Sequence, residues 1–259
     1  MAWKVWNMGG HSHWSQIKRQ KWANDAKRGQ LFSKLVREIA VAAREGGPDP
    51  DLNPRLRLAI ERAREQNMPM DTIERAIKRA TGADEEASQY QEVRFEGYGP
   101  GGVAIMIDAL TDNRNRTVSE VRQVLTRNGG SLGEAGCVSW QFESRGVIVV
   151  ETDEGQDADE VALAAIDAGA EDVKIEDGRI EVYTAPADLA QVRAGLEERG
   201  LKVASAELTM LPKASVPLDE KTAVQVLRLL DALEDLEDVQ RVYSNAEFPD
   251  SVLLEYASR

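Results

Sequence analysis

Residues 146–210 read GVIVVETDEGQDADEVALAAIDAGAEDVKIEDGRIEVYTAPADLAQVRAGLEERGLKVASAELTM, and this stretch decides the fold class. Its apolar pattern predicts strands at 146–152, 172–176, 179–184 and 202–210 and helices at 157–168 and 186–199. The order strand, helix, strand, strand, helix, strand is that of the ferredoxin-like split βαβ unit. We therefore expect one compact α/β sandwich here.

The segments on both sides of this unit predict a second α/β sandwich. Alternating apolar residues predict strands near 93–95, 103–107 and 138–142, the last of which contains Trp140. Thr117 and Glu120 form a predicted capping box that opens a helix. A helix at 219–234 and a strand at 239–247 follow the split unit, and the earlier sheet is the simplest place for them. The split unit is therefore expected to be inserted in this domain.

The N-terminal third predicts a helical bundle. Residues 30–45 carry apolar residues at spacings of three and four before a Gly-Gly-Pro stop, whereas the spacing within 14–28 is weaker. Asn53-Pro54 is typical of a helix start. Asp71 with Glu74 predicts a capping pair at the start of a short helix that ends at Gly82.

The expected fold is therefore α+β with three domains: an N-terminal helical bundle and two α/β sandwich (ferredoxin-like) domains, the third inserted in the second. The predicted boundaries are 1–13 for an N-terminal extension or arm, 14–82 for the helical nucleic-acid-binding domain, 83–144 with 206–259 for domain II, and 145–205 for domain III. Residues 1–7 are interpreted as an upstream extension, because Met8 is a second plausible start.

Composition excludes several classes of protein. One cysteine, Cys137, rules out a disulfide framework, and two histidines, His11 and His13, are too few for a zinc site. No segment reaches the roughly 18 consecutive apolar residues of a membrane helix, and the N-terminus lacks the apolar core of a signal peptide. We expect a soluble, cytoplasmic protein with no membrane partner.

The net charge of −13 hides an asymmetry between the two ends of the chain. Residues 1–80 contain 16 Lys and Arg against 9 Asp and Glu, whereas the remaining residues contain 16 and 36. A segregated basic module is typical of a polyanion binder, and the acidic remainder favours solubility. The alternative is that helix surfaces here are simply rich in Arg and Glu.

The strongest candidate interface is the run WSQIKRQKW at 14–22, continued by two further cations. Cations neutralise phosphates and release counterions, while an indole can stack on an exposed base. The alternative is that the tryptophans pack into the bundle and the cations are only solvated. The candidate residues are Trp14, Lys18, Arg19, Lys21, Lys27 and Arg28, with Trp22 at the end of the run.

Further cations could extend this interface. Arg55 and Arg57 lie in the second bundle helix, and Arg62, Arg64, Arg75, Lys78 and Arg79 follow; taken singly, each is an ordinary solvated residue. Arg114 and Arg116 precede a predicted helix N-terminus, where free amides also favour anions, so they are a second candidate phosphate contact. Their alternative is a capping loop whose arginines pair with local acids.

No pattern indicates catalysis, a cofactor or a metal site, so we expect a protein that is not an enzyme. The run GYGPGG at 97–102 satisfies G-x-G-x-x-G, but a strand follows it, whereas the dinucleotide motif opens a helix. A glycine-rich strand connection is the favoured interpretation, with a moving or partner-contacting loop as the alternative. Cys137 is expected to be an inert, buried thiol.

Several long runs resemble the YebC/PmpR family. They are GHSHW at 10–14, AKRGQLFSKLVREIAVAAREGG at 26–47, NPRLRLAIERAREQNMPMDTIERAIKRATG at 53–82, EGYGPGGVAIMIDALTDNRNRTVSEVRQVLTRNGGSLGEAGCVSWQF at 96–142, and VQRVYSN at 239–245. The resemblance implies a three-domain fold, and it implies that His11, Ser12, Trp14 and the lysines after them contact nucleic acid. His13 stands where the family usually has lysine.

Three functions remain open from the sequence. The resemblance implies either a ribosome-associated factor that helps synthesis of difficult sequences such as proline runs, or a DNA-binding transcriptional regulator. We expect the first, an RNA- or ribosome-binding translation factor, with rRNA or DNA as the partner. The third hypothesis is a protein-interaction scaffold with incidental charge. The oligomeric state is left open.

Overall fold

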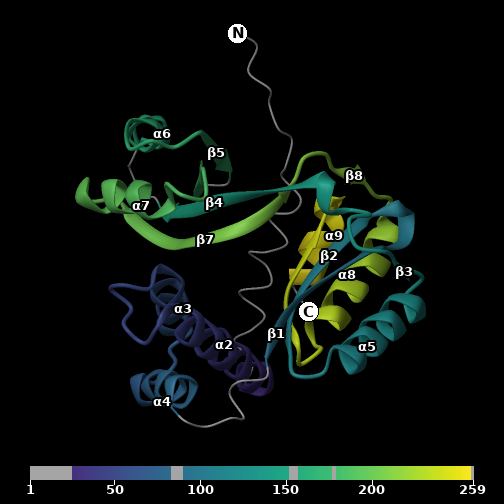
Figure 1. Cartoon of the computed structure of the whole chain (residues 1–259). Coiled ribbons are helices and arrows are strands. Elements are labelled where there is room, and N and C mark those ends of the chain that lie inside the picture. Colours follow the sequence, from purple (N-terminus) through teal and green to yellow (C-terminus); the bar gives the residue numbers. More distant parts are fainter. Residues whose placement is uncertain (1–24, 83–89, 152–156, 177–178, 258–259) are drawn as a thin grey trace. The chain divides into compact units, whose positions relative to one another are not determined.

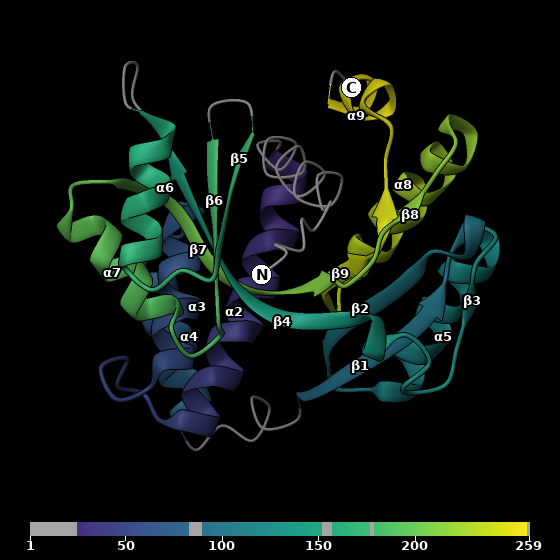
Figure 2. The same ribbon diagram turned by 90° about the horizontal axis from the view of Figure 1, so that it is seen from above.

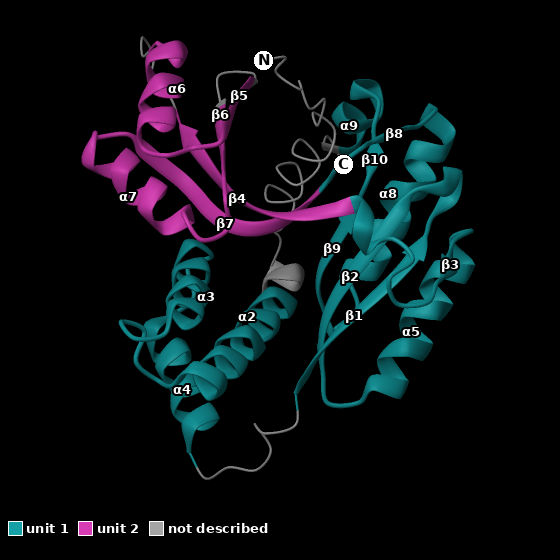
Figure 3. Ribbon diagram, turned by 45° about the horizontal axis from the view of Figure 1, so that its top comes forward, with its two compact units in different colours: residues 1–141, 212–259 teal, residues 142–211 magenta. Residues whose placement is uncertain are grey.

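The computed structural model describes residues 25–82, 90–151, 157–176 and 179–257. The chain separates into two compact units, residues 1–141 with 212–259 and residues 142–211 (Figure 3). The first unit holds the helical domain and domain II, and the second is the inserted domain. Among the described residues, no helix is both long and apolar enough to cross a membrane.

The helical domain packs three described helices around one apolar core (Figure 1). They are α2 (Asp25–Gly46), α3 (Pro54–Glu65) and α4 (Met70–Thr81). Ile39, Leu56 and Ile73, one from each helix, are buried against one another because apolar residues recur on one side of each helix. The segment 14–28, whose apolar spacing is weaker, lies largely outside the described residues.

The starts of α3 and α4 differ in their capping. Asn53 caps α3 as expected: its Oδ1 accepts a hydrogen bond from the Leu56 amide at 3.1 Å. The predicted capping pair of Asp71 and Glu74 is wrong, because the N-cap of α4 is Pro69, two residues earlier, and Pro69 makes no side-chain hydrogen bond. Asp71 instead lies inside the first turn of α4, where its charge still favours the helix dipole.

Domain II is a sheet with two long helices. Its main elements are β1 (Gln91–Tyr98), β2 (Ala104–Thr111), α5 (Arg114–Arg127), β3 (Ser131–Leu132), α8 (Glu220–Glu234) and β9 (Val239–Ser244). The smaller elements are η2 (Pro100–Gly102), η3 (Ser139–Gln141), β8 (Val216–Pro217), β10 (Ala246–Glu247) and α9 (Asp250–Ala257). The strand order is β3-β1-β2-β9, with β1 and β9 both antiparallel to β2.

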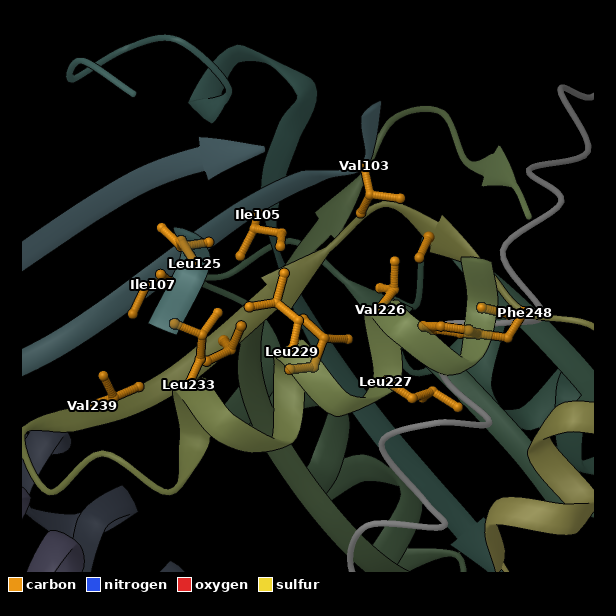
Figure 4. Close-up of a cluster of buried hydrophobic side chains, with 14 of the residues drawn as sticks. Val103, Ile105, Ile107, Leu125, Val226, Leu227, Leu229, Leu233, Val239 and Phe248 are labelled. Atoms are coloured by element: carbon orange, nitrogen blue, oxygen red, sulfur yellow. The ribbon is translucent and has the colours of Figure 1, made fainter. Parts of the chain in front are cut away.

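The position of β9 shows that the inserted unit interrupts domain II. Ile105 of β2 pairs with Ser244 of β9 although the whole second unit lies between them in the sequence. Figure 4 shows the core that joins the two halves: Ile107 from β2, Leu125 from α5 and Leu233 from α8 are among its buried side chains. Apolar burial across this layer is therefore the main force that closes domain II.

Two local predictions in domain II are wrong. The helix α5 begins at Arg114, one turn before the predicted capping box, because Asn113 caps it by accepting from the Arg116 amide at 3.1 Å. The predicted strand around Trp140 is a loop with one 3₁₀ turn. The amides that a strand ladder would use are instead bonded to the carboxylate of Glu96.

The inserted unit has the expected split βαβ architecture. Its elements are β4 (Phe142–Glu151), α6 (Ala158–Asp167), β5 (Asp172–Glu176), β6 (Arg179–Thr184), α7 (Leu189–Glu198) and β7 (Lys202–Pro212). The strand order β5-β6-β4-β7 is the ferredoxin-like order. Side chains of both helices share a core with Ile148 and Val182, and Figure 2 shows α6 and α7 on one face of this sheet.

Candidate nucleic-acid interface

The N-terminal part of the predicted interface lies outside the described residues. This holds for His11, Ser12, His13, Trp14, Lys18, Arg19 and Lys21. Lys27 and Arg28 fall in the first turns of α2, but their side chains also lie outside the described part. These residues stay predictions, and the interface is built here from the cations of α3, α4 and α5.

Five cations of α3 and α4 are exposed and form no ion pair with a described carboxylate. They are Arg57, Arg64, Arg75, Lys78 and Arg79. Arg57 and Arg64 are seven residues apart, so they project from the same side of α3, and Arg75 and Arg79 are four apart on α4. Unpaired, solvated cations at helical spacing are suited to contact phosphate oxygens.

Neutral contacts hold three of these five side chains. The Arg57 guanidinium donates to the carbonyls of Pro50 at 3.0 Å and Asp51 at 2.8 Å, and Arg75 Nε donates to the Asp71 carbonyl at 2.9 Å. Arg64 Nε lies 3.4 Å from the Met70 sulfur. These contacts orient the side chains but leave their positive charge uncompensated.

Other cations of the bundle are already paired with carboxylates. Arg55 forms ion pairs with Glu45 and Glu92, and Arg62 with Glu38 at 3.1 Å. The pairing of Arg55 favours a structural role over the predicted phosphate contact, because a phosphate would have to displace two carboxylates. The basic count of the bundle therefore overstates the charge that is available to a ligand.

Arg116 is also committed to carboxylates. Its guanidinium lies 2.7 Å from Asp238 Oδ2 and 2.8 Å from Asp112 Oδ1. The same Asp238 oxygen accepts hydrogen bonds from Thr117 at 2.8 Å and Thr111 at 3.1 Å. This Asp238 cluster, formed by Asp238, Arg116, Thr111, Thr117 and Asp112, favours the structural alternative for Arg116.

The hydrogen bonds of this cluster lower the pKa of Asp238. Burial by itself would raise the pKa of this carboxyl, but the hydrogen bonds from Arg116, Thr117 and Thr111 outweigh it and lower the pKa. The hydrogen bond to Asp238 raises the pKa of Arg116 in turn.

Arg114 differs from Arg116. It is exposed at the first position of α5 and has no partner among the described residues, so its phosphate contact stays a prediction.

Two exposed aromatic side chains were not identified from the sequence. Trp140 and Tyr98 flank the loop at 133–139, and the indole of Trp140 is 67% exposed. The available signal was that Trp140 is the one tryptophan outside the first 22 residues, in a glycine-rich segment. The exposure of Trp140 was not predicted, because the segment around it was interpreted as a strand that alternates with Val138 and Phe142.

The predicted burial of Cys137 is only partly confirmed, and its low reactivity stays a prediction. Cys137 is free of disulfides and only partly buried, and burial, followed by the charge of Glu96, raises its thiol pKa. A raised pKa keeps the sulfur protonated and weakly nucleophilic. Within the described ranges, no cluster of three His, Cys, Asp or Glu side chains is arranged to hold a metal ion.

Comparison with known proteins covers almost the whole chain. Residues 12–83 match the model of the TACO1/YebC protein N-terminal domain, and residues 90–246 match that of the TACO1/YebC second and third domain. The chain is 54% identical to a probable transcriptional regulatory protein of Halothermothrix orenii over 96% of this chain and 98% of the relative. A protein of the same description from Thermomicrobium roseum is 57% identical over 95% and 98%.

A solved structure has the same fold. The crystal structure of a conserved hypothetical protein from Aquifex aeolicus superposes with a TM-score of 0.77 at 48% sequence identity. The match covers 88% of this chain and 97% of that chain. The three-domain architecture is therefore shared with a close structural relative.

Proposed function

Since the chain belongs to the TACO1/YebC family, we propose that it is a non-enzymatic, nucleic-acid-binding regulator of gene expression that acts in the cytoplasm. The family's relatives are named probable transcriptional regulatory proteins, which supports regulation as the general role. The partner that we propose is nucleic acid, and the surface is the basic face of α3 and α4.

The observation that carries the proposal is the set of five uncompensated cations on α3 and α4. The whole chain has a net charge of −13, so long-range repulsion would keep a polyanion away from an average position on its surface. This group of five exposed cations, which have no carboxylate partner in the described chain, departs locally from that average. Its charge can be used fully in counterion release when phosphates bind.

We favour RNA on the ribosome as the target, with the protein as a translation factor that assists synthesis of difficult sequences such as proline runs. The support is the resemblance to a family that is described as ribosome-associated; the phosphate contacts of helix-surface cations carry no base readout and suit either nucleic acid. DNA-binding regulation of transcription is the second candidate, and the names of the relatives favour it.

Sedimentation separates these two candidates. We expect the protein to sediment with ribosomal fractions of a sucrose gradient at low salt and to leave them at high salt, because phosphate contacts weaken with ionic strength. Absence from the ribosomal fractions at low salt, combined with retention of a defined promoter fragment, would reverse the order of the two candidates.

A charge-reversal pair tests the surface itself. Lys78→Glu with Arg79→Glu should flatten the slope of log affinity against log salt by about 0.7 per lost contact on single strands and about 0.9 on duplexes, or more where the new carboxylates repel phosphate. The matched control is Lys221→Glu with Arg228→Glu on α8, two exposed positions that change the net charge by the same amount.

The two variants distinguish a local interface from general electrostatics. We expect the α8 variant to keep the native slope. Equal slopes for the native chain and the α4 variant would remove α4 from the interface. If the native chain shows no salt-dependent binding to any nucleic acid, the scaffold hypothesis replaces the proposal.

A further inference from the structure

A buried carboxylate fixes the loop between β3 and η3. Glu96, only 6% exposed, accepts hydrogen bonds from the amides of Gly136 at 2.8 Å, Val138 at 2.8 Å and Ser139 at 2.7 Å. Burial would raise its pKa, but these amides outweigh burial and lower it, so the carboxylate is ionised at neutral pH. Three charge-assisted bonds to one side chain hold the loop backbone in place.

Two aromatic side chains converge on one carbonyl of this loop. The Tyr98 hydroxyl donates to the Cys137 oxygen at 3.0 Å, and the Trp140 indole Nε1 donates to the same oxygen at 3.1 Å. The polar edge of each ring is therefore satisfied by the protein. Trp140 remains 67% exposed and Tyr98 37% exposed, and among the described residues neither ring has an aromatic or cationic stacking partner.

A cation lies beside this aromatic pair. Lys213 Nζ donates to the Trp140 carbonyl at 2.9 Å, and its side chain is exposed. Within the described chain, Lys213 has no carboxylate partner. A flat apolar face next to an uncompensated ammonium matches the chemistry of a nucleotide, which carries a planar base and a phosphate.

We propose that Trp140 and Tyr98 form a stacking platform for an unpaired nucleobase, with Lys213 contacting the adjacent phosphate. The inference rests on the proposed function and adds a second contact, with a base, to the phosphate contacts of α3 and α4. Pre-organisation supports it: because the Glu96 bonds and the shared Cys137 carbonyl already fix the rings, little conformational entropy is lost when a base stacks.

Fluorine NMR tests the platform in the full chain. All tryptophans are replaced biosynthetically by 5-fluorotryptophan, and the resonance of Trp140 is identified by its loss in Trp140→Phe. We expect this resonance to shift when a single-stranded uridine oligonucleotide is added. An abasic oligonucleotide of the same length, which keeps the phosphates and lacks the bases, should leave it in place.

Affinity measurements give the size of the effect. Trp140→Ala should weaken binding of the uridine oligonucleotide about 5- to 150-fold, the loss expected for one stacked base. Trp140→Phe keeps an aromatic face and should lose less than Trp140→Ala. Leu254→Ala is the control, since Leu254 is also 67% exposed but lies on α9, and its affinity should be unchanged.

The outcomes separate this inference from the proposed function. If the uridine oligonucleotide binds with a normal salt dependence while the Trp140 resonance and the Trp140→Ala affinity do not change, the platform is wrong and the proposed function stands. If neither oligonucleotide binds while ribosomes do, the platform is wrong and the proposed function stands; if the chain binds no nucleic acid of any kind, both are wrong. A shift caused by an oligoproline peptide but by neither oligonucleotide would assign the rings to a peptide and overturn the nucleobase.

Discussion

The C-terminal half of α4 and the N-terminal turn of α5 carry similar basic residues with different surroundings. Lys78 and Arg79 on α4 are exposed and have no carboxylate partner in the described chain. Arg116 on α5 is held between Asp238, whose side chain is 3% exposed, and Asp112. The first pair leaves charge for a ligand, whereas the second residue uses its charge to neutralise a buried carboxylate of its own domain.

A basic residue can bind phosphate only if it is exposed and its charge is not already compensated. Arg116 is exposed, with 45% of its side chain accessible. However, Arg116 and Arg55 are paired with carboxylates, whereas Lys78 and Arg79 are not. Whether a carboxylate already compensates the positive charge distinguishes a structural cation from one that can bind phosphate.

The largest expected effect is the loss of the buried carboxylate. Asp238→Ala should lower the free energy of unfolding by about 2–4 kcal/mol. This is less than the loss expected for a wholly buried ion pair, because water can solvate the exposed part of Arg116. Urea unfolding followed by circular dichroism measures it. Asp112→Ala, which removes the exposed partner of the same guanidinium, should cost about 0–1 kcal/mol. Equal losses would show that the cluster does not depend on burial.

The lowered pKa of Asp238 predicts that the stability of the protein depends on pH. Because the folded state lowers the pKa of Asp238, its contribution to stability is complete at neutral pH, and it is lost as pH falls below about 4 and through the folded pKa. Native protein should therefore lose more stability than Asp238→Ala between about pH 5 and 3. Parallel stability curves for the two proteins would contradict this assignment.

Glu96 extends the comparison to a carboxylate that is paired with backbone amides. Glu96→Gln should cost about 1.5–3 kcal/mol of unfolding free energy, since an uncharged amide oxygen replaces two acceptor oxygens and its NH₂ group faces donors. Glu134→Gln, an exposed change in the same loop, should stay within about 0.5 kcal/mol. Similar stabilities for both variants would mean that the Glu96 contacts do not hold the loop.

Arg116→Lys sharpens the comparison by keeping the charge and changing its shape. Nη2 of Arg116 donates to both Asp112 and Asp238, and a lysine ammonium, which lies one bond nearer the backbone, reaches the two carboxylates less well, so we expect a loss of about 1 kcal/mol in urea unfolding. Arg114→Lys, two residues away in the same turn, should be neutral. A neutral Arg116→Lys would indicate that charge alone, without geometry, is sufficient for the cluster.

The smallest expected effect on stability is at the uncompensated cations. Lys78→Ala and Arg79→Ala should each change the free energy of unfolding by less than about 0.5 kcal/mol while weakening nucleic-acid binding. Thermal or urea unfolding and an affinity titration on the same samples would check both statements. A large loss of stability would place these residues in the structural class with Arg116.

Much of the fold could be predicted from residues 146–210 and from the periodicity around them. The split βαβ order and the Asn53 cap followed from local patterns, and the return of the chain to the earlier sheet followed because the split unit had no place for the strand predicted at 239–247. The strand around Trp140 was wrong because the distant carboxylate of Glu96 takes the amides that a strand would use, and the capping box at Thr117 was wrong because Asn113, one turn earlier, caps the helix. Most of the N-terminal candidate residues lie outside the described part and stay predictions.

By itself the sequence determined the succession of most helices and strands, the insertion of one domain in another and the concentration of cations toward the N-terminus. Apolar periodicity and net charge are properties of neighbouring residues, so they can be read along the chain. Only the tertiary structure decided which cations are compensated and which rings remain exposed. Arg116 and Asp238 are 122 residues apart in sequence yet 2.7 Å apart in space, and ion pairing depends on the second distance alone.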